Sequence, residues 1–152
     1  MYPSALMAFL HHLAAFTVVA ALAVEVAMFK PPLTVQQARR LLRTDMVFGA
    51  AATVVLIVGL LRVAFFEKGP AYYWHDLFFL IKFGAFALAG LISIYPTVTF
   101  LSWRKAIDAG AAPEVSAERT RGVRMCLMLE LTAIVVILLG AALMARGAGY
   151  LR

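Results

Sequence analysis

Four long apolar stretches, separated by short polar connections, make up most of the 152-residue chain. Each stretch is close to or above the roughly 20 residues with which an α-helix crosses the hydrocarbon core of a bilayer. Short connections make consecutive helices antiparallel neighbours. The pattern therefore predicts an all-α, integral membrane, antiparallel four-helix bundle. It forms a single transmembrane domain over residues 1–152, with spans at about 4–29, 45–66, 72–103 and 123–145.

The ends of the spans carry helix signals. Thr44 or Asp45 is a suitable N-cap for the second span, because either side chain accepts hydrogen bonds from a first helical turn. Pro96 lies inside the third span, where Ser93 and Thr97 are expected to satisfy the backbone groups that a proline frees. No Lys or Arg precedes the first span, so we expect a retained helix rather than a cleaved signal peptide.

Composition agrees with a surface that faces lipid. Hydrophobic residues make up 64% of the chain and charged residues 14%, whereas a soluble domain is about half apolar and about a quarter charged. We therefore expect the lipid bilayer as a partner. The net charge of +6 comes from loops without interleaved aromatics, which predicts contact with anionic lipid and no binding of nucleic acid. The single cysteine, Cys126, forms no intrachain disulfide, and the sequence leaves a homo-oligomer open.

Basic residues crowd into the first and third connections, over residues 30–43 and 104–122. Because Lys and Arg are retained in cytoplasmic loops, both connections are predicted to lie inside. Both termini are then expected to lie outside. Tyr72-Tyr73-Trp74 and Trp103, at the two ends of the third span, are typical of the headgroup zone.

Several ionisable side chains lie inside the spans. Such groups cost several kcal/mol at bilayer depth unless they are paired or face a polar interior, so they are candidates for function. The set comprises His11, His12 and Glu25 in the first span, Arg62 in the second, Lys82 in the third and Glu130 in the fourth.

Helical spacing sorts these residues. His11 and Glu25 are close to four turns apart and share one face, whereas His12 points about 100° away. His75 and Lys82 are two turns apart, so we expect both on one polar face of the third span.

Depth along the spans separates two groups. His11, Arg62 and Lys82 are predicted to form a cationic cluster towards the outer leaflet. Glu25 and Glu130 are predicted to form an acidic pair nearer the inner leaflet.

A histidine inside a helical bundle is a natural axial ligand for haem, and neighbouring cations suit the propionates. His75 lies near the surface, so a single histidine ligand, His11, fits better than a pair. Interpretations that need no cofactor stay open. His11 can hydrogen-bond at the interface, Arg62 and Lys82 can extend to the headgroups, and Glu25 can contact basic residues nearby.

Several short motifs are distributed along the whole chain: Leu10-His11-His12, Thr44-Asp45, Gly59-Leu60-Leu61-Arg62, Glu67-Lys68-Gly69, Tyr72-Tyr73, the region of Lys82, and Ser93-Ile94-Tyr95-Pro96-Thr97. In these motifs the chain resembles an uncharacterised family of small bacterial four-span membrane proteins. That resemblance implies the fold and no particular activity. It also implies a place in a bacterial inner (cytoplasmic) membrane, with both termini on the periplasmic face.

The chain also resembles, more distantly, the HemJ family of protoporphyrinogen IX oxidases, through His11, Lys82 and Glu130. This resemblance implies a b-type haem and redox chemistry on a tetrapyrrole within the membrane. The chain has Ser93 and Tyr95 where HemJ proteins carry a further histidine late in the third span. Binding of haem or a quinone is therefore implied more directly than porphyrinogen oxidation.

Our leading hypothesis is a HemJ-like membrane redox protein that binds haem b, with His11 as the iron ligand. The cofactor-binding candidates are His11, His12, Arg62, His75 and Lys82, and the catalytic candidates are Lys82 and Glu130. One alternative is a non-enzymatic scaffold or assembly subunit of a larger membrane complex. Another is a transporter for a small anion or a proton.

Overall fold

The computed structural model describes residues 2–147, which form helices and no strand. Four of the helical segments are long and apolar enough to cross a membrane, so the expected all-α membrane bundle is confirmed. The elements are α1 (Tyr2–Met28), α2 (Val35–Leu61), the π-helical turn η1 (Arg62–Phe66), α3 (Pro70–Trp74), α4 (Leu77–Ser102), α5 (Arg104–Asp108) and α6 (Ala117–Ala145).

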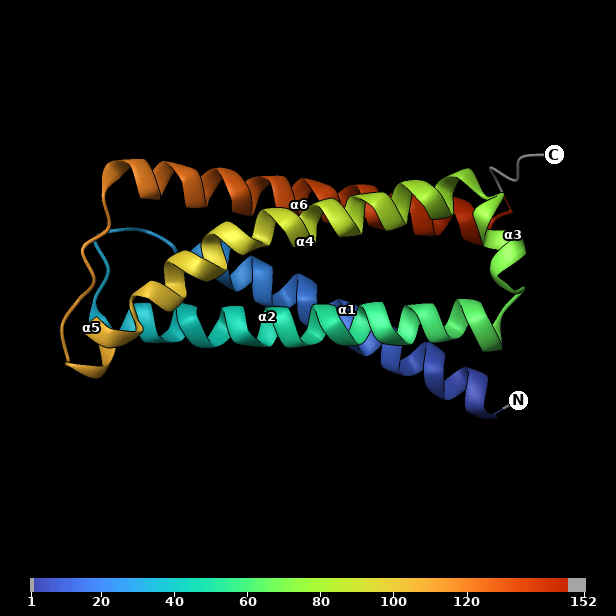
Figure 1. The fold of residues 1–152 in the computed structure, drawn as a ribbon, viewed down its shortest axis with the longest axis horizontal. Coiled ribbons are helices and arrows are strands. Elements are labelled where there is room, and N and C mark those ends of the chain that lie inside the picture. The colour runs from blue at the N-terminus through green and yellow to red at the C-terminus, as the bar shows by residue number, and fades with distance from the viewer. Residues whose placement is uncertain (1, 148–152) are drawn as a thin grey trace.

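The long helices form two antiparallel hairpins, α1 with α2 and α4 with α6 (Figure 1). We call the end that holds α5 and the connections 29–34 and 109–116 the loop end. The opposite end, with the start of α1, η1 and α3, is the terminal end. Figure 1 shows α4 close to α2 at the loop end and diverging from it towards the terminal end. The two hairpins therefore join mainly at the loop end.

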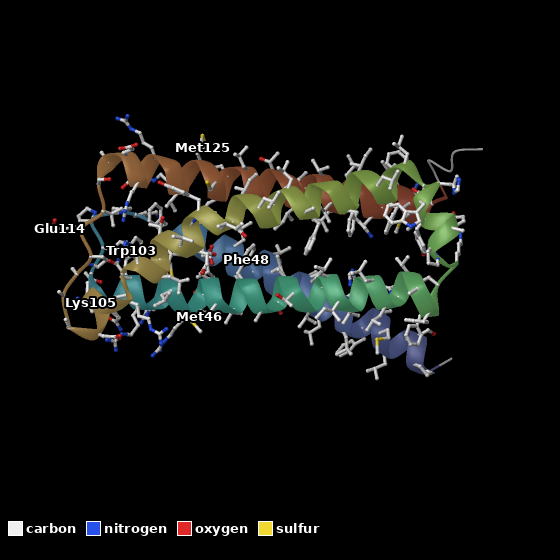
Figure 2. The ribbon with its side chains drawn as sticks, viewed as in Figure 1. Met46, Phe48, Trp103, Lys105, Glu114 and Met125 are labelled. Atoms are coloured by element: carbon white, nitrogen blue, oxygen red, sulfur yellow. The ribbon has the colours of Figure 1, made fainter. Side chains whose placement is uncertain are left out.

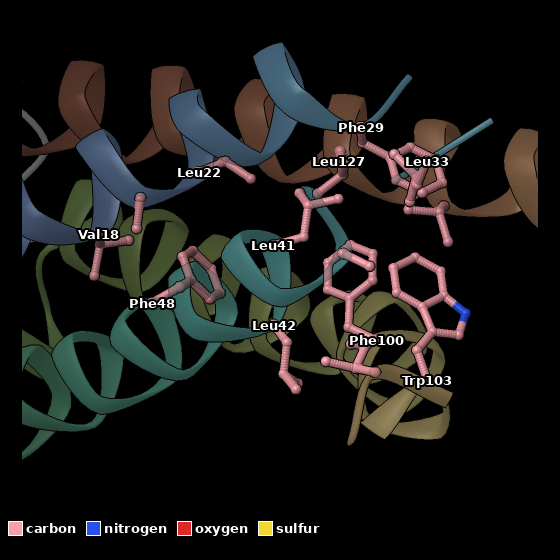
Figure 3. Packing of buried hydrophobic residues seen from close by; sticks show 14 of the residues in the cluster. Val18, Leu22, Phe29, Leu33, Leu41, Leu42, Phe48, Phe100, Trp103 and Leu127 are labelled. Carbon is pink, nitrogen blue, oxygen red and sulfur yellow. The ribbon is translucent and has the colours of Figure 1, made fainter. Parts of the chain in front are cut away.

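An aromatic cluster forms the centre of the core at the loop end (Figure 3). The rings of Phe29 and Trp103 stack with their planes only 7° apart, and Phe100 lies 5.0 Å from Trp103 between ring centroids. Phe29, Phe100 and Trp103 are each at most 3% exposed. Trp103 thus belongs to the core, whereas the sequence suggested a place in the headgroup zone.

Two glycines on α6 allow α4 to approach closely. A Cβ atom added to Gly122 would lie 2.9 Å from the ring of Tyr95. One added to Gly140 would lie 3.3 Å from the backbone oxygen of Phe78. At these two positions α4 therefore packs directly against the backbone of α6.

Large apolar side chains cover the outside of all four long helices. Phe16 is 73% exposed, Leu91 67% and Met125 62%, a pattern that lipid tails and not water would stabilise. Towards the terminal end, few side chains between Leu77 and Thr97 are buried. The main hydrophobic cluster is thus concentrated in the half of the bundle near the loop end.

The second helix begins ten residues earlier than the N-cap predicted from the sequence. Thr34 is the N-cap: its hydroxyl accepts a hydrogen bond from the Gln37 backbone N–H at 3.2 Å. The Gln37 side chain accepts one from the Thr34 backbone N–H at 2.8 Å, which completes a capping box. Asp45, expected at or beside the cap, therefore lies in the middle of α2.

The third predicted span is interrupted near its start. The short helix α3 ends at Trp74, and Asp76 then caps α4 by accepting hydrogen bonds from the backbone N–H groups of Phe78 and Phe79. The membrane-spanning helix begins at Leu77 rather than Tyr72. The fourth membrane-spanning helix, like the second, starts earlier than the sequence predicted: α6 begins at Ala117, after the N-cap Ser116.

Candidate functional site

One face of α1 points into the bundle, as the helical spacing predicted. Ala14, Val18, Leu22 and Glu25 recur at intervals of three or four residues and are all buried. Leu22 is fully buried and Glu25 is 1% exposed. Packing of the apolar residues on this face therefore places the carboxyl of Glu25 in the interior.

Asp45 brings a second carboxyl into the same interior from α2. It is 4% exposed, and its Oδ1 accepts a hydrogen bond of 2.8 Å from the hydroxyl of Thr97 on α4. Thr97 is thus bonded across the two hairpins and not to the backbone that Pro96 frees. Ser93 instead donates to the Gly90 carbonyl at 2.8 Å, so the expected role of both residues beside the proline is wrong.

Glu130 supplies a third carboxyl, from α6, and is 1% exposed. The carboxyls of Asp45 and Glu130 lie near enough to Glu25 for their charges to repel one on Glu25. Three helices thus bring Glu25, Asp45 and Glu130 together, and we call these residues the carboxyl cluster. The sequence predicted Glu25 with Glu130 and missed Asp45.

The carboxyl cluster has no cation to balance it in the part of the chain that the structure describes, where the one salt bridge joins Arg62 to Glu67. Oε1 of Glu25 and Oε1 of Glu130 are buried without any hydrogen-bond partner. Arg124 is exposed on α6, six residues before Glu130, which is about 9 Å along the helix axis. The acids therefore lie just below the basic surface of the loop end, separated from it by apolar core.

The cationic residues predicted near the outer leaflet also come together, at the terminal end. The positive charges of Arg62 and Lys82 act on the ring of His11. Arg62 pairs with Glu67 at 2.6 Å, and the Lys82 Nζ lies 5.7 Å from the centroid of the Phe79 ring. Arg62 is thus already occupied, whereas Lys82 keeps its amine available.

His11 packs closely against α2. Its Cε1 would be 3.2 Å from a Cβ atom added to Gly59, so the ring takes the space that a side chain there would fill. Its Nδ1 is buried and has no hydrogen-bond partner. His11 is thus a half-buried imidazole with one ring nitrogen unused.

The other two histidines do not enter the interior. His12 is exposed, with Nδ1 2.7 Å from the Ala8 carbonyl of its own helix. His75 is exposed too, with Nδ1 2.8 Å from the Ala71 carbonyl. The break before α4 separates His75 from Lys82, so the shared face predicted for these two residues does not form.

The short helix α3 carries the aromatic residues predicted at one membrane surface. Trp74 is 59% exposed, as an interfacial ring would be. Lys68 donates a hydrogen bond of 3.2 Å to the Tyr72 hydroxyl, and this bond raises the pKa of its amine above the ordinary value. Burial of the Tyr73 ring raises the pKa of its phenol.

Among residues 2–147, no group of three or more His, Cys, Asp or Glu side chains is arranged to hold a metal ion.

Four apolar helices with polar groups directed inward define a multi-pass membrane protein. The chain belongs to the family described as "Predicted membrane protein (DUF2214)", whose sequence profile matches residues 3–149. No curated protein and no solved structure matches the chain.

Proposed function

We propose that this protein binds and transfers protons within the membrane, with Glu25, Asp45 and Glu130 as the proton-binding groups. The observation that supports it is the burial of three carboxyls from three helices, without a paired cation in residues 2–147. Ionised carboxylates in such a place are far more costly than protonated ones. The resting cluster holds protons, and its chemistry consists of exchanging them.

The position of the cluster favours exchange with the loop end. Water admitted by a transient opening of the apolar core at that end would donate hydrogen bonds to the unused oxygens of Glu25 and Glu130. Basic residues crowd at the loop end, so we place it in the cytoplasm of the bacterium, with the N-terminus outside. Protons would then be exchanged with the cytoplasmic side first.

Proton flux into liposomes tests this proposal. The full chain is reconstituted with an internal pH-sensitive dye, and a potassium gradient with an ionophore sets the potential. We expect flux above that of protein-free liposomes. Glu130→Gln should lower it by at least about tenfold, because positioned proton-transfer groups contribute that much or more. Glu118→Gln is the matched control, since Glu118 is an exposed acid on the same helix.

Infrared spectra provide a second measurement, independent of flux. The absorption of neutral carboxyl groups should fall in Glu130→Gln and stay unchanged in Glu118→Gln. Flux equal to that of empty liposomes, or equal flux in the two variants, would refute the proposal. A stoichiometric partner that co-purifies with a non-conducting protein would favour the scaffold alternative.

A haem-b redox protein is the second candidate, supported by the buried, unpartnered Nδ1 of His11. In this candidate His11 would supply one axial ligand and the amine of Lys82 would pair with a propionate. His12 and His75 lie on the surface, so the described residues offer no second histidine ligand inside the bundle. A haem held there would supply one-electron chemistry.

The absorption spectrum of the purified protein tests the second candidate. We expect a Soret band that His11→Ala abolishes and that the neighbouring variant His12→Ala retains. A folded protein that stays colourless after haem is supplied would eliminate it.

A further inference from the structure

A groove opens at the loop end between α2 on one side and α4 with α5 on the other. Its volume is about 350 Å³, and three arginines line it: Arg39 and Arg43 from α2, and Arg104 from α5. Asp108 is the one acid in its lining, so the three cations and one anion leave two positive charges. The groove is therefore suited to an anion.

The arginines are available for a ligand. Arg39 donates one hydrogen bond, of 3.2 Å, to the Ile107 carbonyl, which holds its guanidinium beside α5 and leaves its other N–H groups free to donate. Arg43 and Arg104 make no hydrogen bond or ion pair within the described chain. A phosphate group would supply the acceptors that these guanidinium groups lack.

The same groove also has exposed apolar side chains in its lining. Met46 on α2 and Leu101 on α4 line it and are 61% and 44% exposed. Met46 lies on the membrane side of Arg43, and Figure 2 shows it on α2 near the loop end, where Lys105 lies on α5. A free phosphate would contact the arginines alone, whereas a phospholipid would also cover these side chains.

A second groove, of about 290 Å³, lies between α1 and α2 and shares Arg43 with the first. Its other lining residues are small or aliphatic, among them Ala20, Ala21 and Val24. A phosphate held at Arg43 therefore has a groove on either side of α2, and each groove offers apolar side chains beside the arginine. That arrangement suits a headgroup with two acyl chains.

From this geometry we infer that the Arg39–Arg43–Arg104 groove binds the phosphodiester of an anionic diacyl phospholipid. Basic pockets between membrane helices have the chemistry that such headgroups require. The site is independent of the proton chemistry proposed above, because it lies on the bundle surface and uses none of the carboxyl cluster. Each proposal can therefore fail without the other.

Thermal unfolding of the full chain in detergent micelles tests the site. Micelles are doped with phosphatidylglycerol, with phosphatidylcholine of the same chains, or with lysophosphatidylglycerol, and a fourth sample contains inorganic phosphate. We expect phosphatidylglycerol to raise Tm in a saturable way, since a ligand of the folded state stabilises it. The other three additions should raise Tm less or not at all.

Variants locate the effect. Arg43→Gln and Arg104→Gln, on different helices, should each weaken the apparent affinity about fivefold, the effect of about 1 kcal/mol per basic residue at an anionic headgroup. Arg40→Gln and Lys105→Gln are matched controls, since both residues are exposed neighbours that do not line the groove. Equal losses in variants and controls would overturn the site. A response to inorganic phosphate as large as that to the lipid would overturn the choice of ligand.

Discussion

The hydrogen bond between Thr97 and Asp45 joins the two hairpins in the interior, and its energy can be measured. Replacing Thr97 with valine keeps the shape of the side chain and removes the hydroxyl. The bond is 2.8 Å long, within the usual range for a hydroxyl donor. Side-chain bonds between membrane helices contribute about 0.6 kcal/mol on average and up to about 1.7 kcal/mol. Asp45 is buried and Thr97 partly buried, so we expect a coupling of about 1 kcal/mol.

A double-mutant cycle isolates that coupling. Unfolding free energies are measured for the wild type, Thr97→Val, Asp45→Leu and the double variant, by titration with a denaturing detergent. Thr97→Val should destabilise the wild type but cost about 1 kcal/mol less when Asp45 is already absent. Thr99→Val is the matched control, because the Thr99 hydroxyl donates to the Tyr95 carbonyl of its own helix at 2.8 Å. Its coupling to Asp45 should be close to zero.

Two results would refute this reasoning. A coupling for Thr97 within the ~0.3–0.5 kcal/mol expected of independent sites would mean that the bond does not hold the hairpins together. A coupling for Thr99 equal to that for Thr97 would mean that the cycle reports a general rearrangement of α4.

Three further predictions concern packing and capping. Gly140→Leu should destabilise the protein by about 1–3 kcal/mol, because its Cβ would meet the Phe78 backbone oxygen at 3.3 Å; unchanged stability would contradict the close α4–α6 approach. Phe100→Ala should lower the unfolding free energy by about 3 kcal/mol, and the same measurement on Leu91→Ala, on a lipid-exposed position, should change much less. Thr34→Ala should cost about 1 kcal/mol in thermal unfolding, and no loss would argue against the capping box.

The sequence was sufficient to predict the four spans and the inward face of α1. Long apolar stretches report the bilayer directly, and helical spacing put Glu25 on the same face as the buried Leu22. It also grouped His11 with Arg62 and Lys82, because residues at equal depth in antiparallel spans meet. Helical spacing could not predict which partner each charged side chain has, such as the ion pair of Arg62 with Glu67.

Asp45 was missed because the low hydropathy of the first ten residues of α2, nearly three turns, hides the start of the helix. Those turns carry arginines that face outward, so they were interpreted as a loop. A signal was present in Thr34-Val35-Gln36-Gln37, which has the T-x-x-Q pattern of a capping box. Buried Ala38, Leu41 and Leu42 then continue with helical spacing to Asp45. A helix started at Val35 would have directed Asp45 inward.

The break before α4 was missed for a different reason. Tyr73 to Leu77 includes only two residues outside helices, too few to lower a hydropathy average. Asp76 was the local signal, since aspartate caps helices well. The placement of His75 away from Lys82 follows from that cap.

The division into two hairpins has a consequence for biosynthesis. The ribosome completes α1 and α2, with Glu25 and Asp45, before it makes the helices that bear Thr97 and Glu130. The first hairpin must therefore enter the membrane with two interior carboxyls and without the hydroxyl that later bonds to Asp45. Insertion in that order requires both acids to be neutral, or to stay near the headgroups, until the second hairpin arrives. Docking of the second hairpin is then the step that seals them inside.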